Sequence, residues 1–316
     1  MDDLTTPEKR AVSVEQVLEQ LVNEHIEFNT TLVYGLSDLS QDAIQRIRPA
    51  WVLLDGDTKL TIVRHLIDVA EANIELHYDA FGWLVLEERE PDIIEAAIDL
   101  LWENESLELM DRLIDLTSET NIDHLRLSAI RHLERFVVLG EYGEIHSEAY
   151  AKVLQRLQSL WYSGDQDARI RGACIESLGN ASFEALPKLI EEAYSSDSEE
   201  LRRSAVYAMG RTCDDSWEDL LLDELSSRDA QMRYEAARAC GHIESKEALS
   251  LLYRMVIDDE REIQEIAIWS MGEIGGRYAQ NHLEELAERF EDDEELSLLI
   301  EDAIGMASIF DDDFDY

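Results

Sequence analysis

Five histidines are each followed two residues later by a glutamate, and imidazole with carboxylate is a common ligand set for iron or zinc. The pairs are His25/Glu27, His132/Glu134, His146/Glu148, His242/Glu244 and His282/Glu284. Residues two apart on a helix point to different sides, so the members of such a pair cannot hold one ion together. The pairs therefore predict neither a metal site nor metal-dependent catalysis.

Motifs for nucleophilic catalysis or phosphate binding are absent from the sequence. It contains no GxSxG, no GxxxxGK[ST] and no GxGxxG after a strand. Paired acidic residues are abundant, but on exposed helices they indicate a solvated face rather than an acid/base pair. We therefore expect no catalytic residues and no bound cofactor.

A repeat organises the elements that would position any site. Four glycines fall 31 residues apart: Gly179, Gly210, Gly241 and Gly272. The residue five positions before each glycine is small: Cys174, Ala205, Ala236 and Ala267. The residue eight positions before is polar: Arg171, Arg202, Arg233 and Gln264. A fixed period of this length predicts stacked units that bury their apolar faces against their neighbours.

Each period carries two apolar stripes with helical spacing. The first stripe is Leu201, Ala205, Val206 and Met209, and a second follows after a short break at Leu220, Leu221 and Leu225. We expect the small residue to let the next helix approach closely and the glycine to end the helix. Strand patterns are absent, so the prediction is an all-α solenoid of antiparallel helix pairs.

The pattern continues, with drift, towards both ends of the chain. It predicts about eight helix pairs in one solenoid over residues 14–309, after a flexible N-terminal segment (1–13) and before an acidic, aromatic tail (310–316). Pro49 should kink or break its helix, and Pro91 should begin one. The distance from Glu134 to Gly179 is 45 residues instead of 31, so an insertion near residues 140–152 lengthens either a turn or a helix.

At these residues the chain resembles the HEAT repeat family, in particular the short bacterial type found in phycobilin lyase-like proteins. The likeness is clearest over 165–275 and includes the small residue, the Arg three positions before it and Pro187 early in a second helix. It also includes an Asp in the preceding turn: Asp167, Asp197, Asp229 and Asp259. The resemblance implies a ladder of these Asp and Arg residues, which makes Arg171, Arg202 and Arg233 structural.

The resemblance also bears on catalysis. Some HEAT-like proteins are hydroxylases that bind iron through directly adjacent His-Glu pairs, whereas the eight histidines here are followed by Ile, Leu, Tyr or Ser. Another branch comprises phycobilin lyases and related pigment chaperones. The likeness to these lyases rests on the repeat alone, and a shared fold does not imply a shared function. A lyase-like role is therefore kept as an alternative, and it is the main enzymatic one.

Charge limits the class of partner. The chain has 71 Asp and Glu against 27 Lys and Arg, a formal charge of −44, with a normal hydrophobic fraction of 45%. Such a surface repels nucleic acid and anionic membranes and attracts cationic partners. The acidity can equally serve solubility or adaptation to a salty cytoplasm, without being directed at a partner. Three cysteines without metal-type spacing, and the lack of a signal-like apolar run, predict a soluble, cytoplasmic protein.

We expect a partner on the second helices, which usually line the concave side of HEAT-like solenoids. Carboxylates beside aromatic rings suit Lys and Arg side chains, although rings that fill gaps between repeats are the alternative. The candidate residues are Glu191, Glu192, Tyr194, Trp217, Asp223, Glu224, Glu285 and Glu288, with Phe310, Phe314 and Tyr316 in the tail. The predicted function is a non-catalytic scaffold for a basic protein or peptide. Alternatives are a nucleic-acid mimic that inhibits a DNA- or RNA-binding protein, and a lyase-like cofactor chaperone.

Overall fold

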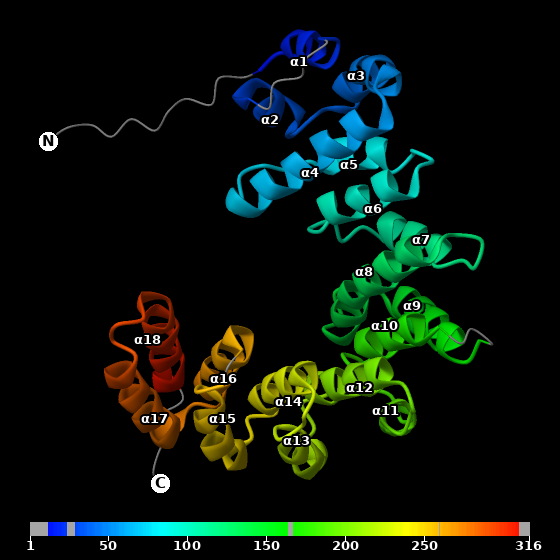
Figure 1. Cartoon of the computed structure of the whole chain (residues 1–316). Helices are drawn as coiled ribbons and strands as arrows, with labels where there is room; N and C mark the ends of the chain where they lie inside the picture. Colours follow the sequence, from blue (N-terminus) through cyan, green and yellow to red (C-terminus); the bar gives the residue numbers. More distant parts are fainter. Residues whose placement is uncertain (1–11, 24–28, 164–166, 259, 310–316) are drawn as a thin grey trace, which may run out of the picture. The chain divides into compact units, whose positions relative to one another are not determined.

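The computed structural model describes residues 12–23, 29–163, 167–258 and 260–309 of the 316-residue chain. Within these ranges every regular element is helical, with 18 α-helices and two short 3₁₀ helices and no strand (Figure 1). The α-helices form eight consecutive pairs, from α2–α3 to α16–α17, between α1 and α18. This confirms the predicted all-α class with a helical-pair repeat. No helix in the described ranges is both long and apolar enough to cross a membrane.

The chain divides into two compact units, residues 1–132 and 133–316, and the boundary falls within α8. That the solenoid is one continuous domain therefore stays a prediction. The first unit contains α1 (Val14–Leu21), α2 (Thr30–Leu36), α3 (Gln41–Leu53), α4 (Gly56–Ala72), α5 (Asp79–Val85), α6 (Pro91–Leu100), α7 (Leu107–Leu116) and the first part of α8 (Asp123–Glu141).

The second unit contains the rest of α8 and the helices that carry the 31-residue period. These are α9 (Ser147–Trp161), α10 (Ala168–Leu178), α11 (Leu186–Tyr194), α12 (Glu199–Arg211), α13 (Glu218–Glu224), α14 (Ala230–His242), α15 (Leu249–Met255), α16 (Arg261–Ile274), α17 (Gly276–Arg289) and α18 (Glu294–Ile309). The 3₁₀ helices, Asp215–Trp217 and Lys246–Ala248, lead into α13 and α15.

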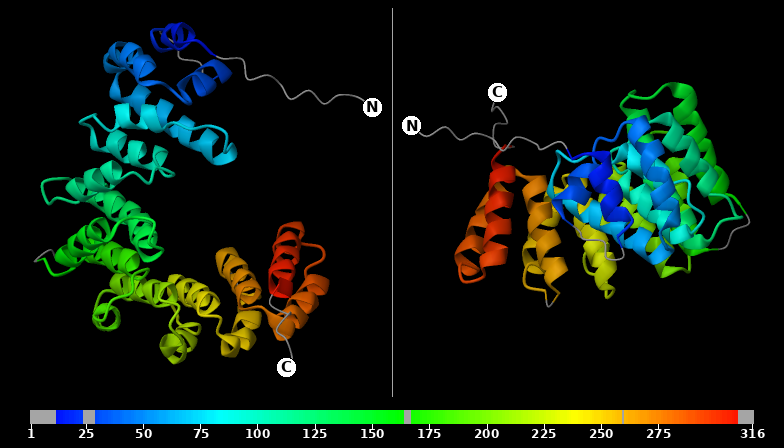
Figure 2. Two further views of the ribbon diagram at one scale, coloured as in Figure 1. Left: turned by 180° about the vertical axis from the view of Figure 1, so that it is seen from behind. Right: turned by 90° about the horizontal axis from the view of Figure 1, so that it is seen from above.

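Two layers of helices make up this second unit (Figures 1 and 2). The first helices of successive pairs, α10, α12, α14 and α16, pack side by side, and α18 continues the row. The second helices α11, α13, α15 and α17 form the other layer, and each packs against the first helix of the next pair. Leu201, Val206 and Met209 of the first predicted stripe are buried between them.

Three of the four repeat glycines do not end the first helices, so for them that part of the prediction was wrong. Gly210, Gly241 and Gly272 lie inside α12, α14 and α16, and Gly179 follows α10 with a right-handed φ of −55°. Their role is steric. A Cβ on Gly210 would lie 2.6 Å from the Cα of Ala239 in the next helix, closer than real Cβ contacts come.

The same contact recurs along the row of first helices. A Cβ on Gly179 would meet the Cα of Ala208 at 2.9 Å, and one on Gly272 would meet the Cα of Ala303 at 3.1 Å. Glycine therefore serves here by letting two helix backbones touch. The predicted small position is confirmed as a packing position, because the side chains of Ala205 and Ala236 are fully buried.

The polar position eight residues before the glycine ties each pair to the preceding turn. In three successive repeats its side chain donates to a backbone carbonyl oxygen there: Arg202 to Ser196 at 2.9 Å, Arg233 to Ser227 at 3.2 Å and Gln264 to Asp258 at 2.8 Å. Asp229 caps α14 by accepting from the backbone N–H of Gln231, and it pairs with Arg203 at 3.2 Å. For Asp229 and Arg233 the implied pairing of the repeat Arg with the repeat Asp is not found, since Asp229 pairs with Arg203 and Arg233 pairs with Asp258. The contacts with the turns still give Arg202 and Arg233 a structural role.

The helix bounds test three further expectations. Pro49 lies inside α3, which continues through it to Leu53, so the expectation of a break was wrong. Pro91 occupies the first turn of α6 as predicted. The insertion near residues 140–152 lengthens helices, since α8 has 19 residues and α9 has 15.

We predict that Gly210→Ala destabilises the second unit by about 1–3 kcal/mol, because the added methyl group must push α12 away from the backbone of α14. Unfolding in urea, followed by circular dichroism, measures the change. Gly305→Ala is the matched control in α18, where an added Cβ has no atom within 4 Å. That control should be neutral or stabilising by up to about 1 kcal/mol. Equal midpoints for both variants would contradict the close-contact role.

Candidate binding pocket on the first helices of the second unit

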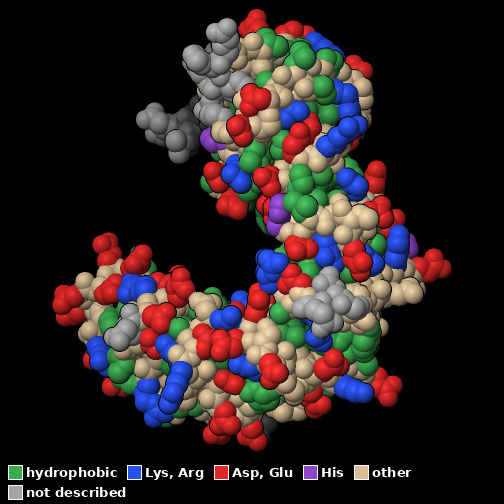
Figure 3. All heavy atoms as spheres, turned by 45° about the vertical axis from the view of Figure 1, so that its right-hand side comes forward, with side chains coloured by type: hydrophobic (Ala, Val, Ile, Leu, Met, Phe, Trp, Pro, Cys, Tyr) green, Lys and Arg blue, Asp and Glu red, His purple; other side chains and the backbone are tan. Residues whose placement is uncertain are grey.

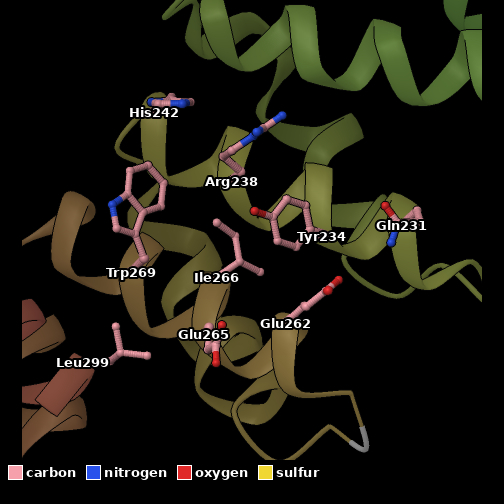
Figure 4. A pocket seen from close by; sticks show the side chains of 9 residues that line it. All are labelled: Gln231, Tyr234, Arg238, His242, Glu262, Glu265, Ile266, Trp269 and Leu299. Carbon is pink, nitrogen blue, oxygen red and sulfur yellow. The ribbon is translucent and has the colours of Figure 1, made fainter. Parts of the chain in front are cut away.

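A pocket of about 680 Å³ opens between α14, α16 and α18 (Figure 4). Its lining residues are Gln231, Tyr234, Arg238 and His242 of α14, Glu262, Glu265, Ile266 and Trp269 of α16, and Leu299 of α18. Three first helices therefore build it, and no second helix contributes a lining residue. We refer to it as the α14–α16–α18 pocket.

Helical spacing explains why these side chains share one space. On α14 the lining residues recur every three or four positions, which places them on one face of the helix. The opposite face of α14 carries Ala236, Ala237 and Cys240, which are buried in the core. The pocket side chains of α14 thus lie on the face of the helix that is turned away from its buried residues.

One end of the pocket contains a basic residue, Arg238, whose charge is balanced by a neighbouring carboxylate. Arg238 forms an ion pair with Glu235 on its own helix. Its guanidinium carbon also lies 4.4 Å from the ring centroid of Tyr207 and 5.7 Å from that of Tyr234, within the range of cation–π contacts. Burial raises the pKa of Glu235, while Arg238 opposes that shift.

His242 is uncharged at neutral pH. Burial, followed by the positive charges of Arg211 and Arg238, lowers its pKa from 6.5 to about 4. Its ring meets the indole of Trp269 edge to face, with the centroids 5.3 Å apart at an angle of 74°. This contact joins α14 to α16 across the pocket.

The other end of the pocket is acidic. Glu262 is exposed and has no cationic partner among the described residues. Glu265 accepts from the Nε of Arg261 at 3.2 Å. Arg261 also binds Asp293 at 2.8 Å and thereby lowers the pKa of that carboxyl to about 2. Ile266 and Leu299 supply apolar surface near Trp269.

This arrangement suits binding more than reaction. None of the nine lining residues is Ser, Thr, Cys or Lys, and the rings of Tyr234 and His242 contact Arg238 and Trp269, which are not proton-accepting groups. What the pocket offers is the partly exposed indole of Trp269, a carboxylate free to pair, and an apolar floor. Such a combination accepts a side chain with an apolar stem and a charged end.

The residues singled out from the sequence lie outside this pocket. The structure brings two of them together, since the hydroxyl of Tyr194 donates to Glu224 at 2.5 Å. Burial, and then this hydrogen bond, raises the pKa of Tyr194 to about 12. Glu192 lies 3.4 Å from the guanidinium of Arg171, so part of its charge is already compensated.

The other predicted residues are scattered over the second helices. Trp217 is only 8% exposed, which fits the gap-filling alternative rather than a surface that meets a partner. The remaining carboxylates are exposed: Glu191 on α11, Asp223 on α13, and Glu285 and Glu288 on α17. Phe310, Phe314 and Tyr316 lie outside the described residues.

The two members of the pair His132/Glu134 contact different partners. The Nε2 of His132 lies 3.4 Å from Asp99 on α6, whereas Glu134 accepts from the side-chain amide of Asn180 at 2.9 Å. His146 caps α9 by accepting from the backbone N–H of Ala149. His25 and Glu27 lie outside the described residues.

Sequence reasoning missed the pocket residues because they do not repeat in type. Counting back three positions from each repeat glycine gives Glu176, Tyr207, Arg238 and Trp269. Counting forward one gives Asn180, Arg211, His242 and Glu273. These positions share a register on the first helices and differ in chemistry. The available indication was a register position that alternates between charged and aromatic residues, as Glu176, Tyr207, Arg238 and Trp269 do.

Residues 218–301 match the family of HEAT repeats. This confirms the resemblance to HEAT repeats over these residues, and the match includes the pocket residues of α14, α16 and α18. No curated protein matches the sequence.

Solved structures with a similar arrangement are repeat proteins. The Escherichia coli protein YibA has 13% identity and a TM-score of 0.43, over 86% of this chain and 98% of that chain. Human deoxyhypusine hydroxylase in complex with glycerol has 19% identity and a TM-score of 0.36, over 83% and 95%. A designed armadillo repeat protein in complex with the peptide (KR)4 has 20% identity and a TM-score of 0.40, over 62% and 98%. Repeat scaffolds of this kind are generally non-catalytic, although the hydroxylase is an enzyme.

We predict that His242 makes the folded protein less stable as the pH falls from 6.5 towards 4. The unfolded chain binds a proton at its ordinary pKa in this window, whereas the folded chain does not, so unfolding is favoured as the pH falls. Between pH 6.5 and pH 4, the melting temperature of the His242→Gln variant should therefore fall less than that of the wild type. Thermal unfolding of both proteins across this range tests the prediction, and parallel curves would contradict it.

Proposed function

We propose that this chain is a non-catalytic scaffold that binds a basic protein segment, and that the α14–α16–α18 pocket receives one Lys or Arg side chain of that segment. HEAT and armadillo-like repeat folds commonly serve as protein-interaction scaffolds, and the HEAT match includes this pocket. The observation that carries the proposal is the pairing of the partly exposed ring of Trp269 with the uncompensated carboxylate of Glu262 in one cavity.

Trp269 and Glu262 lie on the same face of α16, seven residues or two turns apart. A cationic side chain that lies along the helix can stack on the indole and extend its charge towards the carboxylate. Indole gives the strongest cation–π contact of the aromatic side chains, worth about 0.5–2 kcal/mol. Ile266, between them on the helix, offers surface to the aliphatic part of the ligand.

The cations already in the pocket do not oppose this ligand strongly. The charge of Arg238 is balanced by Glu235 and held against Tyr207, and His242 is neutral. Arg261 is surrounded by Glu265, Asp293 and Glu295. The pocket region therefore keeps a negative balance that favours a cation.

The whole chain adds a long-range attraction to this local site. Its formal charge is −44, and carboxylate side chains spread over the surface visible in Figure 3 rather than gathering in one patch. Such a field steers a basic partner towards the protein and speeds association, and salt screens it. The exposed carboxylates of α11, α13 and α17 contribute to this field. A cytoplasmic location is part of the proposal, because Cys174, Cys213 and Cys240 are free thiols.

We predict that a fluorescent octapeptide of alternating Lys and Arg binds the full-length protein, with an affinity that falls as salt rises. Trp269→Ala should weaken binding by about 2–30-fold, the range expected for one cation–π contact. Glu262→Gln should weaken it less, because the carboxylate is exposed to solvent. Fluorescence anisotropy at low and high salt measures both effects.

Trp102→Ala is the matched control, since Trp102 is 50% exposed and lies in the first unit. It should leave the affinity unchanged. Equal losses for the two tryptophan variants would show that the peptide does not use this pocket. Equal binding of an octapeptide of Asp and Glu would contradict the choice of a basic partner. Once a native partner is known, loss of its nucleic-acid binding in the complex would favour the mimic over the scaffold.

A further inference from the structure

A second cluster of chemically active side chains lies in the first unit, where α6 meets α8. Asp92 and Glu95 are three residues apart on α6, so both carboxylates point to the same side of that helix. His124 follows at the start of α8. Its Nε2 lies 3.1 Å from Oδ1 of Asp92 and 3.7 Å from Oε2 of Glu95. One ligand atom from each residue lies within 4.8 Å of the other two.

We propose that Asp92, Glu95 and His124 bind one divalent transition-metal ion, and that zinc is the ion that fits best. Zinc takes nitrogen and oxygen ligands at about 2.0–2.2 Å, so two ligands of a tetrahedral site are about 3.3 Å apart. The two distances from His124 lie on either side of that value. Small rotations of exposed side chains are enough to bring the two carboxylate oxygens to the same separation.

The donor set selects the class of ion. Magnesium and calcium prefer oxygen ligands in larger numbers, whereas one imidazole with two carboxylates is typical of zinc and its neighbours. The side chains of His124, Asp92 and Glu95 are 44%, 67% and 36% exposed, so a fourth position is open to water. Three protein ligands and one water complete a tetrahedron.

Asp92 and Glu95 lie on the same side of α6 and repel each other, although the positive charges of His124 and Arg64 both act on Glu95. A doubly charged ion offsets both carboxylates at once. On the same two helices, the Nε2 of His132 lies 3.4 Å from Asp99, a carboxyl on which Glu71 also acts. There the other ring nitrogen, Nδ1, lies 2.9 Å from the backbone oxygen of Ser128.

The proposal departs from the expectation that the chain holds no metal. That expectation considered pairs within one helix, and helical geometry does separate those pairs. The ligands here come from two helices, and Glu95 and His124 are 29 positions apart in the sequence. Their proximity depends on how α6 packs beside α8, which no local spacing reveals.

The test is a calorimetric titration of untagged, full-length protein with zinc at pH 7.5, in the presence of excess magnesium to saturate weak acidic sites. We expect one equivalent of tightly bound zinc. His124→Ala and Glu95→Gln should each weaken that site by at least about tenfold, the lower range found when metal sites lose a supporting group. His132→Ala and Asp99→Asn, on the same helices, should leave it unchanged.

Cobalt supplies a second readout that does not depend on affinity. Co²⁺ in a tetrahedral site with a histidine ligand gives visible absorption bands, and His124→Ala should abolish them. Circular dichroism of each variant checks that the helices remain folded. Absence of a stoichiometric zinc site in the wild type would overturn the proposal and leave an ion pair only. A tight site that survives both His124→Ala and Glu95→Gln would overturn it as well, since the ion would then bind elsewhere.

Discussion

The direct contact between the backbones of consecutive first helices is the constraint on which the second unit depends. Gly179, Gly210 and Gly272 each lie against the Cα of an alanine in the next first helix, where an added Cβ would come within 2.6–3.1 Å of that atom. This contact sets the distance between neighbouring repeats. The exposed side chains on those helices must then meet across one repeat step, as Arg238 does with Tyr207 and His242 with Trp269. The pocket is thus a consequence of the close packing of the first helices, and Gly241 itself lies against the pocket residue Trp269, whose ring would be 3.0 Å from an added Cβ.

The same constraint explains how much of the fold could be predicted. Close packing demands small residues at fixed positions, so the 31-residue period can be recognised in the amino-acid sequence. The all-α class with about eight helix pairs was predicted from this period. The role of the glycines was not visible, because a glycine after an apolar stripe fits a helix end as well as a helix contact. The residue that does end α16 is Gly275, with a φ of 64°, three positions after the repeat glycine. Pro49 was misjudged because α3 accommodates it.

The sites were harder to predict than the fold, for a physical reason. Packing restricts buried positions to a few residue types, whereas an exposed position at the same register can hold Glu176, Tyr207 or Trp269. Such positions carry no repeat signature. The carboxylates and rings of the second helices were the more visible pattern, but Tyr194 and Glu224 there form a hydrogen bond with each other. Contacts between helices distant in sequence, such as Asp92 with His124, need the packed structure. Sequence patterns alone cannot supply that distance.

The use of arginine connects these observations with the excess of negative charge. Arg203 reaches Asp229 in the next repeat, Arg261 reaches Asp293 at the start of α18, and Arg233 binds the turn before its helix. Several of the few arginine side chains thus connect neighbouring repeats. The surface is left with an excess of carboxylates, which repel one another. Any cation that binds the folded chain better than the unfolded chain relieves this repulsion and stabilises the fold. Salt screens the repulsion and the attraction for a basic ligand alike. The stability of the free protein should therefore rise with ionic strength over the same range in which its affinity for a basic segment falls.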